Sequence, residues 1–310
     1  MTPVVLDFDG SSGTVPDALV VALQSWQELI RFGCSLRSMR RLDTLLDTVM
    51  PENCGPVLLG SGDFHHVSHL LIRRVARCCR CRVVVMDNHP DNMRFPFGIH
   101  CGSWVSHVAA LPNVTRVDVV GITSSDVSIG RLWENRWLPL LRGKVRYWCI
   151  GTDVRWARRF GLGSAFSVHP TANALIEAFL HSLQPAQPTY LSIDKDVLHP
   201  DVARTNWDQG ALRETHLNAV ISALTPHLAG MDITGDVSSH RYRTRWKRWL
   251  SAIDHQPEIP AAALDSWQRT QRAINARLLT HLASTEAHAE PAQCAAQVVR
   301  TQDRPATDCS

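Results

Sequence analysis

The stretch RVVVMDNHPD, residues 82–91, decides the fold because it runs from an apolar segment directly into polar residue types. Its four consecutive apolar residues suit a β-strand that is covered on both faces. Comparable short apolar runs recur at residues 4–8, 57–59, 116–120, 144–150, 189–193 and 229–233. Between them, apolar residues have helical spacing, for example Val67, Leu70, Leu71 and Val75. This alternation predicts a three-layer α/β/α sandwich around a mostly parallel sheet.

Composition narrows the class of protein further. The chain has 310 residues, of which 45% are hydrophobic and 20% charged, as is typical of a globular protein. No apolar run approaches the roughly 18 residues of a membrane helix, so no membrane association is expected. A net charge of only +3 argues against nucleic acid as a partner. The first residues lack the features of a secretory signal, which predicts a cytoplasmic protein.

The amino-acid composition of the chain changes toward its C-terminus. We expect one α/β domain over residues 1–255, followed by a helical appendage over residues 256–285, where apolar residues keep helical spacing. After Glu286 few large apolar side chains remain, so residues 286–310 are predicted to form a disordered tail.

A basic segment, RYRTRWKRW at residues 241–249, interleaves cationic and aromatic side chains. Such a mixture could hold an anion or a nucleic acid. A solvated helix face with tryptophans docked on the body is the more frequent explanation of such a run, and it is the one we favour.

Three polar clusters follow predicted strands. Asp87, His89 and Asp91 come after residues 82–86 at alternate positions, so their side chains would point the same way along an extended segment. Two further carboxylates, Asp194 and Asp196, repeat this spacing after the strand at residues 189–193. A glycine-rich turn, GSGDFHH at residues 60–66, leaves a third strand. In a parallel sheet these clusters would meet at one edge, where ligands bind.

Carboxylates and imidazoles gathered at one edge would repel and desolvate one another unless cations neutralised them. Singly, Asp and His at strand ends are often only helix caps or loop hydrogen-bonding groups. Together, a mixed oxygen and nitrogen donor set suits a pair of divalent ions such as Mn²⁺, whereas zinc would prefer more Cys or His. The sequence therefore predicts a two-metal site.

The pair of patterns Asp87-x-His89-x-Asp91 and Ser192-x-Asp194-x-Asp196 resembles the signature of the ureohydrolase superfamily, which contains arginase, agmatinase and formiminoglutamase. The glycine-rich turn before the histidines resembles the third metal-binding motif of that family, and the resemblance spans roughly residues 57–238. It implies a three-layer α/β/α fold, a binuclear manganese cluster, and hydrolysis of a guanidinium or related C–N bond by a metal-bridging hydroxide.

The resemblance also implies roles for single residues. Asp87 and Asp194 would bridge the two ions, and the remaining ligands would be divided between them, His65 and Asp91 on one ion and His89 and Asp196 on the other. In the family motif the histidine directly follows the aspartate. Here Phe64 stands in that place, so we expect His65 as the ligand, with His66 as the reserve.

One more histidine matches a family position. His100 resembles the histidine that shuttles a proton near the leaving group, a role that suits an imidazole titrating near neutrality. A hydrogen-bonded loop histidine is the equally weighted alternative.

The substrate-binding positions depart from the family pattern. Where arginases and agmatinases carry a glutamate that pairs with the substrate guanidinium, this chain has Gly235, and Asp236 is the neighbouring substitute. In the place of the substrate loop, Asp208 either binds a cationic group or caps the following helix. Arginine and agmatine are therefore doubtful substrates, and a small or peptide-borne guanidino-type group remains the expected class.

Two other interpretations stay open. Residues 4–11, VVLDFDGS, resemble the first motif of haloacid dehalogenase-type phosphatases, which would make Asp7 a nucleophile and Asp9 an acid/base beside Mg²⁺. That interpretation leaves the cluster after residues 82–86 without a role. Alternatively, the chain is a non-catalytic ureohydrolase-fold protein that binds a metal or ligand. Family members often form closed oligomers, so a homo-oligomer is expected in either case.

Overall fold

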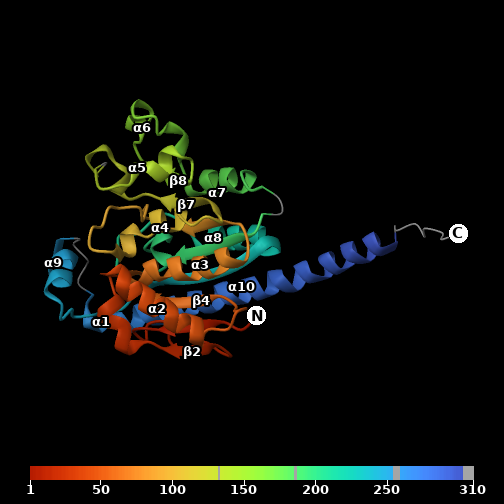
Figure 1. The fold of residues 1–310 in the computed structure, drawn as a ribbon, viewed down its shortest axis with the longest axis horizontal. Coiled ribbons are helices and arrows are strands. Elements are labelled where there is room, and N and C mark those ends of the chain that lie inside the picture. Colours follow the sequence, from red (N-terminus) through yellow and green to blue (C-terminus); the bar gives the residue numbers. More distant parts are fainter. Residues whose placement is uncertain (132, 185–186, 254–258, 303–310) are drawn as a thin grey trace.

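The computed structural model describes residues 1–131, 133–184, 187–253 and 259–302. Within them, nine strands form one sheet in the order β2-β1-β4-β11-β10-β5-β7-β8-β9 (Figure 1). Every pairing in this sheet is parallel. The strands are β1 (Val4–Asp7), β2 (Leu19–Ala22), β4 (Val57–Ser61), β5 (Cys81–Met86), β7 (Val114–Ile122), β8 (Val145–Ile150), β9 (Phe166–His169), β10 (Thr189–Asp194) and β11 (Leu228–Asp236). An antiparallel pair, β3 (Gly33–Cys34) and β6 (Ile99–His100), lies outside the sheet.

Helices cover both faces of the sheet, which confirms the predicted three-layer α/β/α architecture. Alternate residues of β5 belong to different cores, since Val83 and Val85 lie in one hydrophobic cluster and Val84 and Met86 in the other. The first cluster is covered by α2 (Leu36–Val49), α3 (Ser68–Cys78) and α4 (Val105–Ala109). The second is covered by α7 (Ala172–His181), α8 (Glu214–Leu224) and α10 (Ala261–Gln302). Shorter helices are α1 (Gln27–Ile30), α5 (Trp137–Leu141), α6 (Arg155–Arg159) and α9 (Arg245–Ile253).

The seven strands expected from apolar runs are all present, as β1, β4, β5, β7, β8, β10 and β11. The two that the sequence analysis missed, β2 and β9, are the edge strands of the sheet. Each has four residues and is partly open to solvent. The sequence of β9, FSVH, lacks a continuous apolar run, whereas β2, LVVA, is apolar although Leu19, Val20 and Ala22 are exposed at the sheet edge. No helix among the described residues is long and apolar enough to cross a membrane.

The helix α10 differs from the predicted appendage and tail. Its residues Ile274, Leu278 and Leu282 are buried in the second core cluster, so the helix packs against the same core as α7 and α8. The helix also continues to Gln302, through most of the stretch predicted as a disordered tail. Alanine and glutamine favour helix even where few large apolar side chains occur. Residues 303–310 lie outside the described part of the chain.

The basic segment enters helix α9 at Arg245, and its arginines are exposed, as expected of a solvated face. Trp249 is 65% exposed and is not docked on the body, whereas Trp246, 38% exposed, lies against Phe95 with ring centroids 6.2 Å apart. The segment is held by Lys247, whose ammonium donates hydrogen bonds to the carbonyl oxygens of Glu28, Leu29 and Arg31 at 2.7–3.0 Å. An ammonium that satisfies three carbonyls at the end of α1 stabilises this contact.

Glu28 holds the start of the same segment, which leads to a prediction about pH. Its carboxylate accepts hydrogen bonds from the backbone of Arg243, from the backbone and hydroxyl of Thr244, and from His240. Burial alone would raise the pKa of Glu28, but these hydrogen bonds lower it to about 2 from 4.5. The stabilisation is therefore present above about pH 4.5 and is lost as the pH falls toward 2.

We expect Glu28→Gln to unfold more easily at pH 7, by roughly 1–2 kcal/mol once the partial exposure of the carboxylate is allowed for. Between pH 4.5 and 2 the variant should lose less stability than the unsubstituted protein, because it carries no carboxylate to protonate. Urea unfolding at a series of pH values checks this. If the free energy of unfolding changed with pH equally in the two proteins, Glu28 would not hold α9.

Candidate metal centre

The site lies at the carboxyl edge of the sheet, where β4, β10 and β5 end close together. Because the strands are parallel and ordered β4-β11-β10-β5, the residues that follow them meet at one edge. His65 lies in a short 3₁₀ helix (Gly62–Val67) directly after β4. The cluster of Asp87, His89 and Asp91 follows β5, and Asp194 ends β10.

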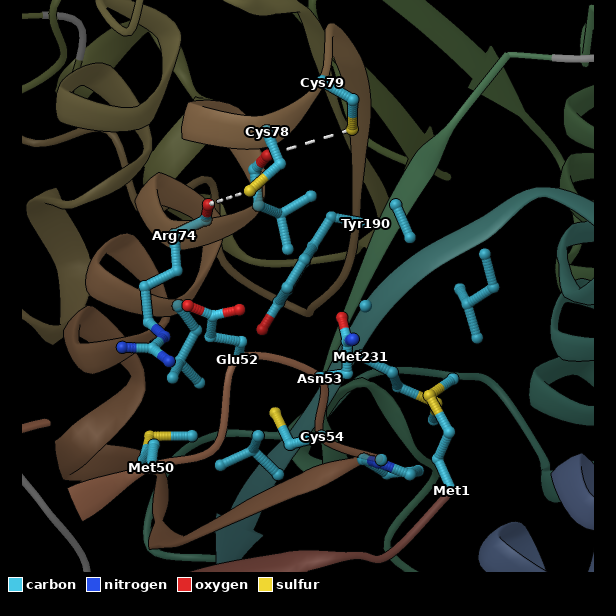
Figure 2. A pocket seen from close by; sticks show the side chains of 18 of the residues that line it. Met1, Met50, Glu52, Asn53, Cys54, Arg74, Cys78, Cys79, Tyr190 and Met231 are labelled. Carbon is cyan, nitrogen blue, oxygen red and sulfur yellow. Dashed lines mark hydrogen bonds between the residues drawn. The ribbon is translucent and has the colours of Figure 1, made fainter. Parts of the chain in front are cut away.

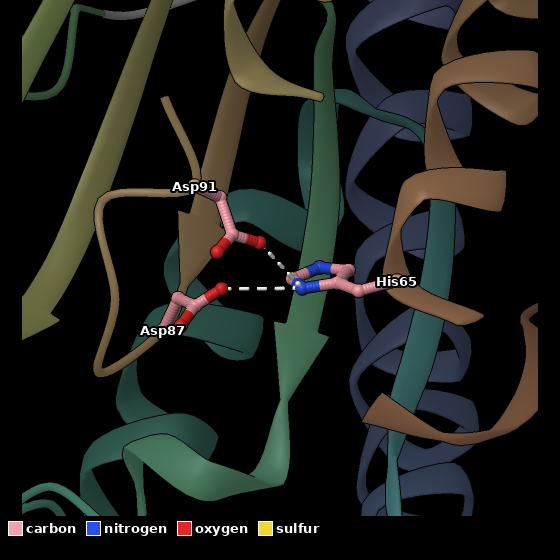
Figure 3. Close-up of side chains that lie close together, drawn as sticks. All are labelled: His65, Asp87 and Asp91. Carbon is pink, nitrogen blue, oxygen red and sulfur yellow. Dashed lines mark ion pairs between the residues drawn. The ribbon is translucent and has the colours of Figure 1, made fainter. Parts of the chain in front are cut away.

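His65, Asp87 and Asp91 form what we call the inner group (Figure 3). The Nδ1 atom of His65 lies 3.1 Å from Asp87 Oδ2 and 3.2 Å from Asp91 Oδ2. A third carboxylate oxygen, Asp194 Oδ2, is 3.3 Å away. All four residues are buried. One imidazole nitrogen and three carboxylate oxygens therefore face a common point.

Asp87, His89 and Asp196 form the outer group. His89 Nδ1 lies 2.9 Å from Asp196 Oδ2 and 3.6 Å from Asp87 Oδ1. In each of the two groups the donor atoms lie within 4.8 Å of one another. The side chain of His89 is 15% exposed, whereas the inner His65 is 1% exposed. The outer group is thus the one that borders solvent.

Asp87 belongs to both groups. Its Oδ2 faces His65, while its Oδ1 accepts a hydrogen bond from the backbone N–H of His89 at 2.7 Å. Asp194 is placed similarly, because Oδ2 faces His65 and Oδ1 accepts from the backbone N–H of Asp196 at 3.0 Å. Asp87 therefore faces both groups, whereas Asp194 faces His65 of the inner group, and the bridging roles of both carboxylates stay predictions.

The charges of the cluster are not balanced by its own side chains. Burial, together with the charge of Asp87, raises the pKa of Asp91 to about 7. Burial and the neighbouring Asp194 and Asp87 also raise the pKa of Asp196 well above its ordinary value. Burial alone would lower the pKa of His65, but the adjacent carboxylates, Asp194 first, raise it well above 6.5. Raised carboxyl and imidazole pKa values are what crowded, buried carboxylates produce when no cation neutralises them.

The tautomer of His65 suits a metal ligand. Ser192 Oγ donates to Asp232 Oδ1 at 2.7 Å, so the same hydroxyl accepts from His65 Nε2 at 3.0 Å. Asp232 is held in turn by the hydroxyls of Tyr190 and Ser68. With a proton on Nε2, His65 would present the lone pair of Nδ1 to a cation bound among the three carboxylates that surround this atom.

His66, the reserve ligand, is not part of either group. It is buried, and neither ring nitrogen makes a hydrogen bond. The 3₁₀ turn places adjacent side chains in different directions, so His65 alone reaches the cluster.

His100 lies among aromatic rings. Its Nδ1 accepts a hydrogen bond from the backbone of Gly102 at 2.9 Å, and its ring contacts Phe95 and stacks 6.0 Å from Phe32. Burial lowers the pKa of His100 to about 3. An imidazole that is neutral at pH 7 in this setting matches the loop-histidine alternative, and the proton-shuttle role stays a prediction.

Asp236 is not available to a substrate, which corrects its predicted role. Its carboxylate is 1% exposed and accepts hydrogen bonds from Lys195, from Asn275 at 3.1 Å and from Ser12 at 2.9 Å. The reason lies in the pairing of β11 with β4, whose register shifts between Thr234 and Asp236. Asp236 therefore points into the network with α10 and away from the metal-binding groups.

Gly235 takes the place that faces the cluster. A Cβ atom built on Gly235 would lie 2.4 Å from Asp194 Oδ1 and 2.5 Å from the backbone nitrogen of Lys195. The residue also has φ +84°, a conformation that favours glycine. The departure from the family glutamate is thus built into the backbone, since no side chain fits here.

Asp208 does lie at the cluster, but as a partner of a histidine. Its Oδ1 lies 2.7 Å from His89 Nε2, and its Oδ2 accepts from Asn88 Nδ2 at 3.3 Å. The cationic substrate group predicted for Asp208 would have to compete with both contacts. The alternative of a helix cap is wrong, because α8 begins at Glu214.

The residues named in the phosphatase interpretation have other contacts. Asp9 pairs with the buried Arg31 at 3.1 Å and accepts from Ser238 at 2.7 Å, and Asp7 accepts from the backbone of Gly10 and from Gln24. Among the described side chains, neither aspartate belongs to a group of donors that could hold a metal. The structure gives that interpretation no metal site.

Sequence analysis missed the residues that orient the two histidines. Sequence patterns place Ser192 in a motif, but they link neither Ser192 nor Asp232, Tyr190 and Asp208 to a histidine. Ser192 stands two residues before Asp194 on β10, so strand alternation alone places it on the same face as that ligand. For Asp208, 119 positions from His89 in sequence, no local signal exists.

A cavity of about 620 Å³ lies elsewhere, near the amino-terminal ends of β4, β10 and β11 (Figure 2). Its lining includes Met50, Cys54, Arg74, Tyr190 and Met231. None of the residues of the inner or outer group lines it. The cavity is thus separate from the inner and outer groups, which lie at the carboxyl edge of the sheet.

Comparison with known proteins identifies one related sequence and several solved structures of similar fold. No family model matches the chain. An uncharacterised protein of Thermotoga maritima is 27% identical over 192 residues, which is 62% of this chain and 62% of that protein. Proclavaminate amidino hydrolase from Streptomyces clavuligerus has a TM-score of 0.49 at 18% identity, over 82% of this chain and 70% of its own. Formimidoylglutamase from Bacillus subtilis has a TM-score of 0.51 at 12% identity, over 92% of this chain and 86% of its own. The likeness to formimidoylglutamase shows that this chain has the arginase-like three-layer α/β/α fold that its sequence predicts.

Proposed function

We propose that the chain is a divergent member of the ureohydrolase superfamily and a metal-dependent hydrolase that cleaves a non-peptide C–N bond. One observation carries the proposal, namely two groups of buried donors that share Asp87. A carboxylate common to two groups suits a pair of cations, which is the arrangement of two-metal hydrolases. The shared fold with formimidoylglutamase supports the same assignment.

Mn²⁺ is the cation that we propose for both positions. Each group offers carboxylate oxygens and one imidazole nitrogen, and no cysteine belongs to either group among the described residues. Oxygen-rich sets of this kind suit Mn²⁺, whereas zinc more often takes Cys and His. When bound, a pair of such ions lowers the pKa of a shared water and so supplies a nucleophile near neutral pH.

The chain's own residues contribute orientation and charge. The hydroxyl of Ser192 and the carboxylate of Asp208 hold the two imidazoles from behind, and the backbone N–H groups of His89 and Asp196 fix the carboxylates of Asp87 and Asp194. This preorganisation leaves the donor atoms little freedom to move.

The proposed substrate carries a guanidino, amidino, formimino or acylamino group, either as a small molecule or within a peptide. The position that would present a carboxylate to a guanidinium is Gly235, and Asp236 is engaged by Lys195. Recognition by a glutamate as in arginases therefore cannot operate, and arginine and agmatine are not expected to be preferred within this class.

The test is release of urea, ammonia or an amine from a panel of guanidino, amidino, formimino and acylamino compounds by the Mn²⁺-loaded protein. We expect turnover of at least one compound, and its loss when the metal is removed by a chelator and its return when Mn²⁺ is added back. A metal-loaded protein that is silent across the panel would instead favour a non-catalytic metal-binding protein.

A further inference from the structure

The Nε2 atoms of the two histidines in the cluster have different hydrogen-bond partners. The inner His65 donates from Nε2 to Ser192, which is buried together with its partner Asp232. The outer His89 faces Asp208 with its Nε2, and that side chain is 69% exposed. The inner histidine is thus held by buried residues, while the Nε2 of the outer histidine contacts a single exposed carboxylate.

Asp208 is held in place by Asn88, which lies between the ligands. The Asn88 amide nitrogen donates to the backbone oxygen of Asp208 at 3.1 Å and to its carboxylate at 3.3 Å. The backbone N–H of Asn88 donates to Asp196 Oδ1 at 3.1 Å, and its amide oxygen accepts from the backbone and hydroxyl of Thr123. Asn88 is fully buried, so it ties Asp208 rigidly to the outer group.

We propose that Asp208 is a positioning residue for the outer cation: by accepting the Nε2 proton of His89, it directs the Nδ1 lone pair toward Asp87 and Asp196. The proposal rests on the proposed two-metal function. A carboxylate behind a ligating imidazole fixes its tautomer and raises its basicity, and loss of such a partner typically weakens metal binding about 10–100-fold. Because Asp208 contacts His89 of the outer group while His65 is held by Ser192, only one of two ions should depend on Asp208.

The test is calorimetric titration of the full chain with Mn²⁺. Asp208→Ala should weaken one of the two bound ions by about 10–100-fold and leave the other within about twofold. Asp208→Asn should weaken that ion by an intermediate amount, because its amide oxygen still accepts from Nε2 but carries no charge. The matched control is Asp201→Asn, because His199 and Asp201 form another exposed pair, at 3.3 Å and with Asp201 71% exposed. That variant should bind both ions normally.

Electron paramagnetic resonance gives a second readout that a general loss of stability would not move. With two equivalents of Mn²⁺ per chain, the unsubstituted protein should show the signal of a spin-coupled pair, and Asp208→Ala should show that of an isolated ion. Excess Mn²⁺ should restore the coupled signal in the variant.

Each outcome separates this proposal from the function on which it rests. If the unsubstituted protein binds no Mn²⁺, the role of Asp208 and the proposed two-metal function are both wrong. If it binds two ions and the Asp208→Ala titration is unchanged, or both ions are weakened equally, the role of Asp208 is overturned while the proposed function stands.

Discussion

Replacing Asp87 by alanine should abolish binding of both Mn²⁺ ions at concentrations that saturate the unsubstituted protein. Asp87 is the residue that the inner and outer groups share, with Oδ2 facing His65 and Oδ1 facing His89. Its removal takes a negative charge and a donor atom from each position at once. We expect each affinity to fall by more than about 100-fold, beyond the range typical of residues that act only through a ligand. Turnover of any substrate identified in the panel should disappear with the metal.

Elemental analysis and calorimetry of purified Asp87→Ala provide the measurement. Asp118→Asn is the matched control, because Asp118 is equally buried but pairs with Arg82 away from the cluster. That variant should be less stable yet bind two ions when folded. An Asp87→Ala protein that kept one ion at the original affinity would contradict the shared carboxylate.

Replacing Gly235 by alanine should destabilise the protein by roughly 2–5 kcal/mol. Two costs add: a residue with a Cβ at φ +84° is strained, and the new methyl group would press against Asp194 Oδ1 and the backbone of Lys195. Since the contact falls on a predicted bridging ligand, Mn²⁺ affinity should fall as well. Denaturant unfolding with and without Mn²⁺ measures both effects.

Gly151→Ala separates the two costs. Gly151 has φ +65°, but a Cβ built there meets nothing within 4 Å. Its replacement should cost only the backbone strain, roughly 1–2 kcal/mol, and leave Mn²⁺ binding unchanged. Equal losses in the two variants would mean that the space around Gly235 is not restricted, and a glutamate at that position would then be admissible.

The sequence predicts the central strands because their burial appears as local apolar runs, such as residues 83–86. The segment that follows is not extended: it bends, with Asp91 at φ +46°, so His89 and Asp91 belong to different groups. The parallel order of strands then brings His65 and Asp194 to the same edge.

The environment of the cluster is set by non-local geometry, which no local pattern reports. A register shift in the pairing of β11 with β4 turns Asp236 toward Lys195, although neighbouring residues on a regular strand would have allowed either assignment. Likewise, the partner of His89 comes from a loop 119 positions away. Such features depend on how segments pack, and only the folded chain shows them.

The central claim is that the inner and outer groups hold a pair of divalent ions. Anomalous diffraction at the manganese edge, from crystals grown with Mn²⁺, tests it most directly. We predict two anomalous peaks roughly 3.5–4 Å apart, one beside His65 and Asp91 and one beside His89 and Asp196, with Asp87 between them. Crystals that show no peak at these six side chains, or one peak bound only at the protein surface, would contradict the account.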